Sequence, residues 1–432
     1  MRPYIAHVPR RRSILLVAQL TPPSPLVGAR RPGAIAKYLD LAGHRVTVLT
    51  SIASGTGPVP GAARVVRTRD LLSSPLNWRR ANLETLQGQR QEAYGEASLV
   101  ERLIVPDISV AGWVPFALPR ALTLLRGESI DCVVSTSPPA SAHLIGAVLR
   151  SLGMPWIADL RDGWTFDPPR PAWPTRLQAS ADAVLERVVL RRADRILAVT
   201  RPIASDLERR LRVPATVMTN GFDPDERPAR VAPPLDPARH SLVHTGRMSV
   251  VGRSPRAFFQ GLHDYLQRRP DGAQRLEVVL AGPVSAEQQS LLADKRLEGL
   301  VRSVGSLERP ETLALQRDAD TLLVLAEGND VRPSRSVATG KLFEYLAAGR
   351  PVLVLGEDSE AARIVRDAGA GVAARGDDPG VIASMLERLV DQGLEAPRKA
   401  VDGYSWPALI RRLEAEIEAI LDDNRRTRVR RP

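Results

Sequence analysis

The strongest constraint on the fold is an alternation of short apolar runs with helix-like segments, which occurs twice along the chain. Ser13–Ala18 and Arg45–Thr50 are apolar runs separated by a segment of helical pattern, and the same order recurs through residues 130–219. Short apolar runs that alternate with helices are typical of parallel strands buried on both faces. The pattern therefore predicts βαβ units with right-handed crossovers.

The alternation stops between Asp223 and His240, where five prolines fall in a stretch without apolar periodicity, and it restarts at Ser241. A chain of 432 residues is long enough for two to three domains. We expect two doubly wound, Rossmann-like α/β domains that face each other across a cleft, with ligands outside the carboxyl ends of the strands. The predicted organisation is a tail (1–12), an N-terminal domain (13–222), a linker (223–240), a C-terminal domain (241–403), a helix (404–423) and a second tail (424–432).

Composition excludes several classes of protein. The chain is 44% apolar and 25% charged, which excludes wholesale disorder, and no uncharged apolar run is long enough to span a bilayer. The N-terminal apolar run is too short for a signal peptide and lacks a cleavage site. The single cysteine, Cys132, cannot form an internal disulfide, which favours a reducing cytoplasm.

Most of the net charge of +11 belongs to the two ends of the chain, which are rich in arginine. A protein that binds nucleic acid would concentrate this charge on a structured face, so we expect no nucleic-acid partner. Solvated ends are the simplest interpretation of the two tails. Peripheral contact with an anionic membrane is the alternative, because basic residues near such a surface are attracted to it.

The sharpest motif runs from Leu322 to Gly356, where a strand, a polar loop and a helix beginning near Gly340 follow one another. The amino end of such a helix has unpaired N–H groups and a partial positive charge, which suit an anion. Glu344 lies about 200° around the helix from the apolar Leu342, so its carboxylate is free to accept bonds from ribose hydroxyls. A solvated ion pair of Glu344 with Lys341 is the alternative.

The segment from Gly340 to Pro351 (GKLFEYLAAGRP) resembles the signature of the family 4 glycosyltransferases, which have the GT-B fold. Further segments are similar to the branch of that family found in bacterial surface-polysaccharide assembly. These are Pro22-Pro23 with Gly28 and Arg31, Ala36–Leu39, Pro106-Asp107 with Gly112-Trp113, Thr136–Pro139, Pro155–Trp164, Asn220–Asp223 and Thr245–Arg247.

The resemblance implies a role for particular residues of the second domain. Glu344 would hold the ribose of the donor, while Arg247 and Arg253 would clamp its diphosphate, a task that suits the planar, permanently charged guanidinium group. Arg253 and Glu344 are accordingly expected among the catalytic groups. The remaining residues expected to bind the donor are Gly28, Gly246, Leu307, Gly340 and Lys341.

In the first domain, the resemblance places Asp162 near the transferred sugar, as a third catalytic candidate. An ion pair of Asp162 with Arg161 is the alternative interpretation. Trp113, Arg161 and Trp164 are expected on the acceptor side.

One residue departs from the family pattern. The commonest form has two glutamates, and the position of the first is occupied here by Ser336. This difference leaves open an inactive GT-B protein that binds nucleotide sugars without transferring them. A GT-B nucleotide-sugar epimerase is a further alternative.

Other chemistries find little support in the sequence. Asp223-Pro224-Asp225 and Asp318-Ala319-Asp320 each spell a D-x-D pattern, but neither follows a strand, so we expect no metal. No glycine-rich phosphate loop of the G-x-G-x-x-G type follows a strand.

The sequence as a whole predicts a metal-independent, retaining glycosyltransferase. Its co-substrate would be a nucleotide-diphosphate sugar, with no further cofactor, and its acceptor a polysaccharide or lipid-linked hydroxyl in cell-surface polysaccharide or glycolipid assembly. We expect the protein in the cytoplasm, at the inner face of the cell membrane if the tails bind lipid.

Overall fold

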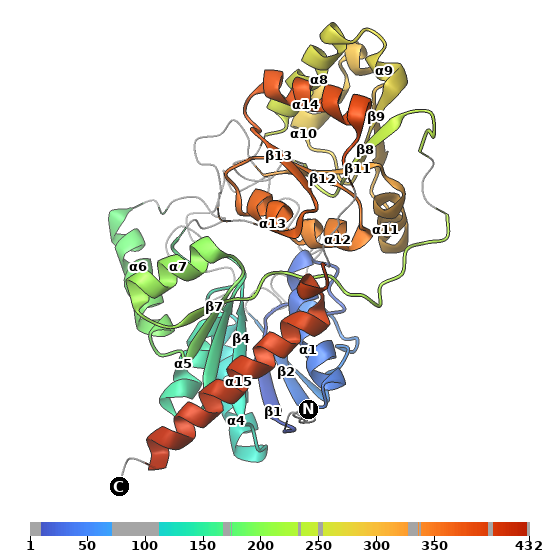
Figure 1. Ribbon diagram of the computed structural model, residues 1–432. Helices are drawn as coiled ribbons and strands as arrows, with labels where there is room; N and C mark the ends of the chain where they lie inside the picture. The colour runs from blue at the N-terminus through green and yellow to red at the C-terminus, as the bar shows by residue number, and fades with distance from the viewer. Residues whose placement is uncertain are drawn as a thin grey trace, which may run out of the picture. The chain divides into compact units, whose positions relative to one another are not determined.

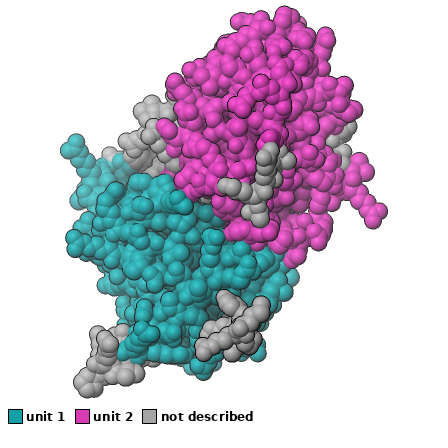
Figure 2. Space-filling model, in the orientation of Figure 1, with its two compact units in different colours: residues 1–219, 406–432 teal, residues 220–405 magenta. Residues whose placement is uncertain are grey.

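The computed structural model describes residues 10–70, 112–166, 173, 175–231, 235–248, 254–326, 336, 338–395 and 401–429. Arg253 and Pro106-Asp107, both singled out in the sequence, lie outside these residues. The chain forms two compact units (Figure 2). Unit 1 comprises residues 1–219 and 406–432, and unit 2 comprises residues 220–405.

Unit 1 is built on a seven-stranded sheet in which every neighbouring pair of strands is parallel (Figure 1). In spatial order the strands are β3 (Arg64–Thr68), β2 (Arg45–Ser51), β1 (Ser13–Val17), β4 (Cys132–Ser137), β5 (Trp156–Leu160), β6 (Arg195–Ala198) and β7 (Ala215–Val217). The order reverses between β1 and β4, so these two strands flank the point where a doubly wound sheet binds its ligand.

Helices cover both faces of this sheet. One face packs against α4 (Val114–Gly127), α5 (Ala142–Ser151), α6 (Arg176–Leu190) and α7 (Arg201–Leu211). The other face packs against α1 (Val27–Leu41) and α15 (Trp406–Val429), and the one-turn helix η1 (Ile52–Ser54) follows β2. The central strands β1, β4 and β5 are almost completely buried, and their apolar residues are mainly Val, Leu, Ile and Ala, as the composition suggests.

Unit 2 repeats the architecture with a six-stranded parallel sheet. Its strands, in spatial order, are β10 (Val301–Gly305), β9 (Leu276–Ala281), β8 (His240–Thr245), β11 (Thr321–Leu325), β12 (Val352–Leu355) and β13 (Gly371–Ala374). Its helices are α8 (Arg256–Arg268), α9 (Gly272–Arg275), α10 (Ala286–Leu292), α11 (Arg309–Asp318), α12 (Gly340–Ala348), α13 (Glu360–Ala368) and α14 (Pro379–Gln392), with short turns η4 (Lys295–Leu297) and η5 (Asp402–Tyr404). Here the order reverses between β8 and β11.

The two parallel α/β sheets confirm the predicted fold class, whereas the cleft between them stays a prediction. The division of the chain differs from the predicted one at the linker. Residues 223–231 and 235–240 pack on unit 2, where Asp236 accepts from the Arg239 side chain and its N–H donates to Glu277. The C-terminal helix does not stand alone, because α15 returns to unit 1.

The two predicted tails are also shorter than expected. Arg12 is only 4% exposed and pairs with Glu418 of α15 through both its Nε and Nη2 atoms, so it belongs to the core of unit 1. At the other end, α15 continues to Val429, which places residues 424–429 in a helix. None of the helices in the described ranges is sufficiently long and apolar to span a bilayer.

Candidate functional site

The carboxyl edge of the unit 2 sheet brings together most of the residues predicted to bind the donor. Gly246 and Arg247 follow β8, and α12, which carries Gly340, Lys341 and Glu344, follows β11. Because β8 and β11 are neighbours at the reversal of strand order, these residues share the position at which doubly wound sheets bind ligands.

Two glycines shape this edge. The N–H of Gly246 continues the sheet by donating to the Ala281 carbonyl, and the residue adopts a φ of +83°. Gly282 follows β9, and a Cβ atom there would lie 2.7 Å from the backbone of Gly246. Only glycine allows the two loops to approach so closely, which leaves the backbone after β8 exposed at the edge.

Lys341 holds the loop after β8 in place. Its Nζ donates to the Arg247 carbonyl at 2.8 Å and lies 3.1 Å from Nε2 of His244. The Nδ1 atom of His244 lies 2.9 Å from the Leu323 carbonyl and must carry the proton there, so Nε2 accepts from the ammonium group. Burial lowers the pKa of His244 to about 3, which keeps the ring neutral in this role.

The Arg247 side chain is half-buried beside this anchored backbone. Among the described residues, its guanidinium has no carboxylate partner and no hydrogen bond. A half-buried cation is normally paired, because removing it from water costs free energy that a counter-charge offsets. Arg247 is therefore available for an anionic ligand at this edge.

Glu344 is only 12% exposed and points to α11, so it is not the solvated side chain that the alternative interpretation describes. Its Oε2 accepts from Nη1 of Arg309 at 2.9 Å and from Nε2 of Gln316 at 3.4 Å. Gln316 also donates to the Thr245 hydroxyl, and the Tyr345 hydroxyl accepts from the Thr245 N–H at 2.8 Å. The carboxylate is thus oriented by a network that reaches the last residue of β8.

Among the described residues, nothing covers the amino end of α12 at Gly340. Its N-cap residue, Thr339, makes no capping bond with its side chain, and a Cβ atom at Gly340 would meet nothing within 4 Å. Unpaired N–H groups at such an end attract anions. Leu307 lies in the loop after β10, where it is partly buried against the core of unit 2.

In unit 1, the carboxyl edge is organised around a buried ion pair. Arg31 of α1 and Asp159 of β5 are 2% and 0% exposed, and the guanidinium donates to both carboxylate oxygens at 2.9 and 2.6 Å. Arg31 also donates to the Met218 and Thr219 carbonyls and lies 5.7 Å from the ring centre of Trp406. This guanidinium is entirely occupied by internal contacts, and the pair holds the pKa of the Asp159 carboxyl below its usual range despite the burial.

Arg161 joins three segments at the same edge. It donates to the carbonyls of Gly28 (2.8 Å), Ser137 (2.7 Å) and Pro138 (3.3 Å). The carbonyl of Gly28 would normally accept from the N–H four residues later in α1, but that residue is Pro32, which has none. Arg161 supplies the missing donor and so fixes the first turn of α1 beside β4 and β5.

Asp162 makes no ion pair with Arg161, because the Arg161 guanidinium is used by the three carbonyls. Burial raises the pKa of the half-buried Asp162 carboxyl, and the nearby charge of Arg161 opposes this shift. Asp162 therefore remains a candidate for chemistry at the edge of unit 1.

The two tryptophans predicted on the acceptor side lie in the core. Trp113 is 0% exposed and donates to the Thr68 hydroxyl, and Trp164 is 5% exposed and donates to Asp182. An indole ring that is covered and hydrogen-bonded in this way supports the fold of its loop and presents little surface to an acceptor.

Aspartates of both D-x-D patterns accept local hydrogen bonds. Asp320 accepts from the N–H and hydroxyl of Ser241 at the beginning of β8, the opposite edge of the sheet from Gly246. In the first pattern, Asp223 accepts from the N–H of Asp225 in a tight turn. Within the described part of the chain, no cluster of three or more His, Cys, Asp or Glu side chains is arranged to hold a metal.

Sequence reasoning missed His244, Arg309 and Gln316, which orient the predicted residues. Arg309 had a usable signal, because Glu308 and Glu311 form a capping box that places the beginning of α11 at this residue. His244 and Gln316 carry no local signal, since each acts through a contact with another element far along the chain.

Comparisons with known proteins agree with this architecture. Residues 28–221 match the model of the glycosyl transferase 4-like domain, which confirms the resemblance over that part of the chain. No protein among the curated ones matches the sequence.

Several solved structures share the fold over both units. They include the N-terminal domain of trehalose-6-phosphate phosphatase from Candida albicans (13% identity, TM-score 0.61, covering 97% of this chain and 98% of that one). A UDP-forming α,α-trehalose-phosphate synthase from Burkholderia vietnamiensis follows (16% identity, TM-score 0.55, 97% and 98%). A structure titled trehalose-6-phosphate from E. coli, bound with UDP-2-fluoro glucose, is also similar (14% identity, TM-score 0.53, 96% and 96%). At these identities the likeness shows the fold, which is that of the GT-B glycosyltransferases.

Proposed function

We propose that this chain, with its glycosyl transferase 4-like domain on a GT-B fold, transfers a sugar from a nucleotide-diphosphate sugar to an acceptor hydroxyl. The observation that carries the proposal is the half-buried guanidinium of Arg247, which has no counter-charge among the described residues and lies at the ligand-binding edge of unit 2. A diphosphate would supply the missing negative charge.

The chemistry follows from where charge develops. In the transition state, the bond from the anomeric carbon to the diphosphate oxygen breaks, and negative charge grows on the leaving group. Arg247, the amino end of α12 and Arg253 would stabilise that charge. In our proposal Lys341 acts on the donor by fixing the backbone of Arg247, and Glu344 accepts bonds from the ribose in an orientation set by Arg309.

Unit 1 would hold the acceptor. Asp162 would contact the transferred sugar, and Gly28 and Arg161 would shape the loop beside it. Retention of the anomeric configuration is part of the proposal: the acceptor hydroxyl attacks from the face that the diphosphate leaves, so its proton passes to the departing phosphate oxygen. Trp113 and Trp164 would support these loops from the core.

We propose further that no metal is required, because arginine and helix N–H groups supply the positive charge. A role in cell-surface polysaccharide or glycolipid assembly, at the cytoplasmic face of the membrane, extends the family resemblance. UDP-hexoses are the first donors to test, since the similar trehalose-phosphate synthase is UDP-forming.

The decisive experiment combines binding with turnover. Thermal shifts are measured with UDP and other nucleoside diphosphates, and a ligand at 100 times its dissociation constant should stabilise unit 2 by about 2.7 kcal/mol. Glu344→Gln should weaken binding of the donor, whereas Glu298→Gln, at an exposed position of the same unit, should leave it unchanged. Undiminished donor binding and turnover in Glu344→Gln would remove its assigned role.

The second candidate is a protein that binds nucleotide sugars without transferring them. It is favoured by Ser336, which is buried, at the position where most family members have a glutamate. Tight donor binding with no product across a broad panel of acceptors would support it. An altered sugar formed without any acceptor would instead indicate an epimerase.

A further inference from the structure

The outer side of unit 1 formed by α4, α5 and α6 carries an unusual surface. These helices pack side by side on one face of the sheet, and α6 lies at the outer edge of the unit (Figure 1). Their outward faces expose large apolar side chains. They are Phe116 (40% exposed) on α4, Val148 (38%) and Leu152 (62%; the residue that ends the helix) on α5, and Leu177 (80%), Val184 (58%) and Val188 (47%) on α6.

On α6 the apolar side chains form a stripe along the helix. Leu177, Ala181, Val184 and Val188 are spaced at i, i+4, i+7 and i+11, which places them within about 60° of one another on one face. The opposite face packs on the sheet through Val189 and Leu190. The stripe therefore faces away from the core of unit 1.

In the described residues of these three helices, the exposed charges have one sign. Arg120 and Arg126 of α4 and Arg176 and Arg187 of α6 are exposed, and among the described residues none of them forms an ion pair. The three helices contain two acidic residues, Asp182 and Glu186, both 0% exposed. Asp182 accepts from Trp164 and Trp173, and Glu186 accepts from Thr165 and Arg210, so neither carboxylate reaches the surface.

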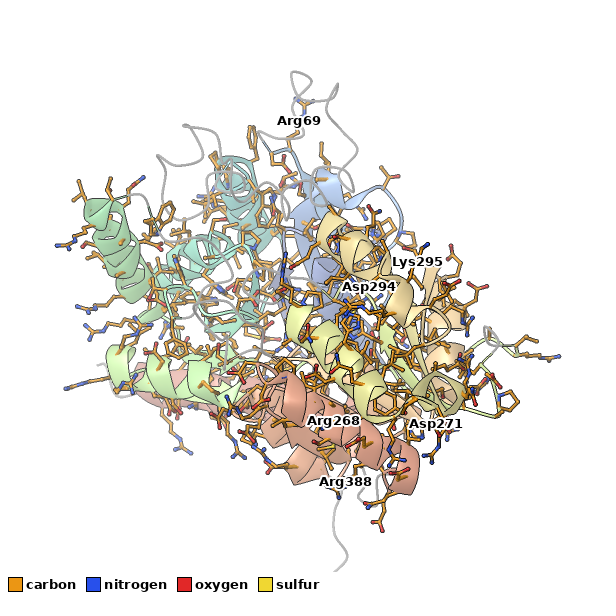
Figure 3. The ribbon with its side chains drawn as sticks, turned by 90° about the horizontal axis from the view of Figure 1, so that it is seen from above. Arg69, Arg268, Asp271, Asp294, Lys295 and Arg388 are labelled. Atoms are coloured by element: carbon orange, nitrogen blue, oxygen red, sulfur yellow. The ribbon has the colours of Figure 1, made fainter. Side chains whose placement is uncertain are left out.

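The outer side of unit 2 differs. Seen from above, Arg268 of α8 and Arg388 of α14 lie on neighbouring helices, and Asp271, Asp294 and Lys295 are on the same unit (Figure 3). Acids and bases mix there, as in the ion pairs of Arg268 with Glu387 and of Arg269 with Asp391. An apolar surface bordered only by arginine is thus particular to unit 1 within the described residues.

We propose that the α4–α6 side of unit 1 is a docking surface for an anionic lipid bilayer. The apolar side chains would enter the boundary between headgroups and acyl chains, while the arginines would meet lipid phosphates. A second copy of this chain fits less well, because antiparallel pairing of two α6 helices would set Arg176 of one against Arg187 of the other. The described residues of the three helices include no exposed acid that would offset the repulsion. The residues of this surface are not those of the arginine-rich ends of the chain.

The test is partition of the full-length protein between buffer and vesicles, measured by flotation. Wild-type protein should bind vesicles containing about 30% phosphatidylglycerol, and pure phosphatidylcholine vesicles only weakly, with the affinity falling as salt is added. Replacing the stripe (Leu177→Ser, Val184→Ser, Val188→Ser) should lower the partition coefficient more than about tenfold. The double variant Arg176→Gln, Arg187→Gln should lower it about 25-fold, since each arginine contributes about fivefold.

Matched variants separate this surface from other causes. Arg268→Gln with Arg388→Gln, on the outer side of unit 2, and Leu41→Ser, an exposed apolar residue of α1, should partition like the wild type. The arginine double variant leaves every apolar contact in place, so it tests the proposal even if the serine variant fails to fold.

Three results would overturn the proposal. The first is wild-type partitioning of the arginine double variant. The second is complete loss of binding when only residues 1–11 and 425–432 are removed, which would assign the membrane contact to the ends. The third is dimerisation without lipid that the serine variant abolishes, together with no vesicle binding by the wild type, which would identify the surface as a self-association face.

Discussion

The carboxyl edges of the two sheets both carry arginines but use them differently. In unit 1, the N–H groups of Arg31 and Arg161 donate to Asp159 and to backbone carbonyls, so both guanidinium groups stabilise the fold. In unit 2, Arg247 has no such partner among the described residues, and Lys341 secures its backbone instead. With 56 arginines in the chain, residue type alone cannot separate the two uses; the pairing of each guanidinium does.

The largest effect is expected in unit 1, from a variant that breaks the ion pair of Arg31 with Asp159. Asp159→Ala leaves the Arg31 guanidinium buried without its carboxylate, which should cost about 3–5 kcal/mol of unfolding free energy. All six tryptophans belong to unit 1, so tryptophan fluorescence in a urea titration reports this unit alone. Asp391→Ala, which removes the exposed ion pairs of Asp391 with Arg269 and Arg275 in unit 2, should cost less than about 1 kcal/mol by circular dichroism.

The role of the Arg247 guanidinium in unit 2 is tested by the variant Arg247→Ala. Removing a cation that stabilises the leaving diphosphate should lower turnover about 10²- to 10³-fold while leaving the stability of unit 2 almost unchanged. Arg256→Ala removes an exposed arginine of the same unit that pairs with Glu287, and it should change turnover less than twofold. Wild-type turnover with Arg247→Ala would show that this guanidinium is not reserved for the donor.

Acid should weaken both units through buried histidines. Burial lowers the pKa of His143 in unit 1 to about 4 and that of His244 in unit 2 to about 3. Below pH 6.5 the unfolded chain binds protons that the folded chain does not, so the unfolding free energy falls as pH falls. Each histidine should cost about 2 kcal/mol at pH 5.

Unfolding followed between pH 7 and 5 measures this effect. Tryptophan fluorescence reports unit 1, and circular dichroism reports both units, so the transition of unit 2 is the part of the circular dichroism change that fluorescence does not show. His244→Gln should flatten the pH dependence of the unit 2 transition and leave that of unit 1 intact. If the unfolding free energy of unit 2 depends on pH as steeply in His244→Gln as in the wild type, groups other than His244 bind the protons on unfolding.

The smallest effect is expected from Arg161→Lys. Lysine cannot reach the carbonyls of Gly28, Ser137 and Pro138 together, and the Gly28 carbonyl would lose its donor, at a cost of about 1 kcal/mol in unit 1. Arg191→Lys, which affects a single bond to the Leu211 carbonyl, is the matched control. The two variants should differ in the midpoint of the tryptophan transition.

Much of the fold could be predicted from local pattern. The apolar runs at 13–18 and 45–50 became β1 and β2 with shifts of one residue at most, because strands buried on both faces need continuous apolar sequence. Edge strands are less constrained. The sequence analysis did not assign β3 and β13, whose residues are only partly buried.

Other differences arise from contacts between distant residues. The sequence did not indicate that α1 begins at Val27, because Pro32 normally interrupts a helix. Here the helix tolerates Pro32, since Arg161 donates to the Gly28 carbonyl in place of the missing N–H. Arg12 was assigned to a tail because Glu418, its partner, lies 406 residues away. In the candidate site, the pattern indicated Arg247 and Glu344, but their surroundings depend on His244, Gln316 and Arg309, which only the folded chain brings together.

Because α15 belongs to unit 1, the last part of unit 1 is synthesised after the whole of unit 2. Unit 2 is in effect an insertion between Thr219 and Trp406, and Arg31 touches both of these residues. On the ribosome, unit 2 has all its strands before the helix that closes one face of unit 1 has been synthesised. Until residues 406–421 emerge, the part of the apolar face that they cover is exposed, so we expect unit 2 to complete its fold before unit 1.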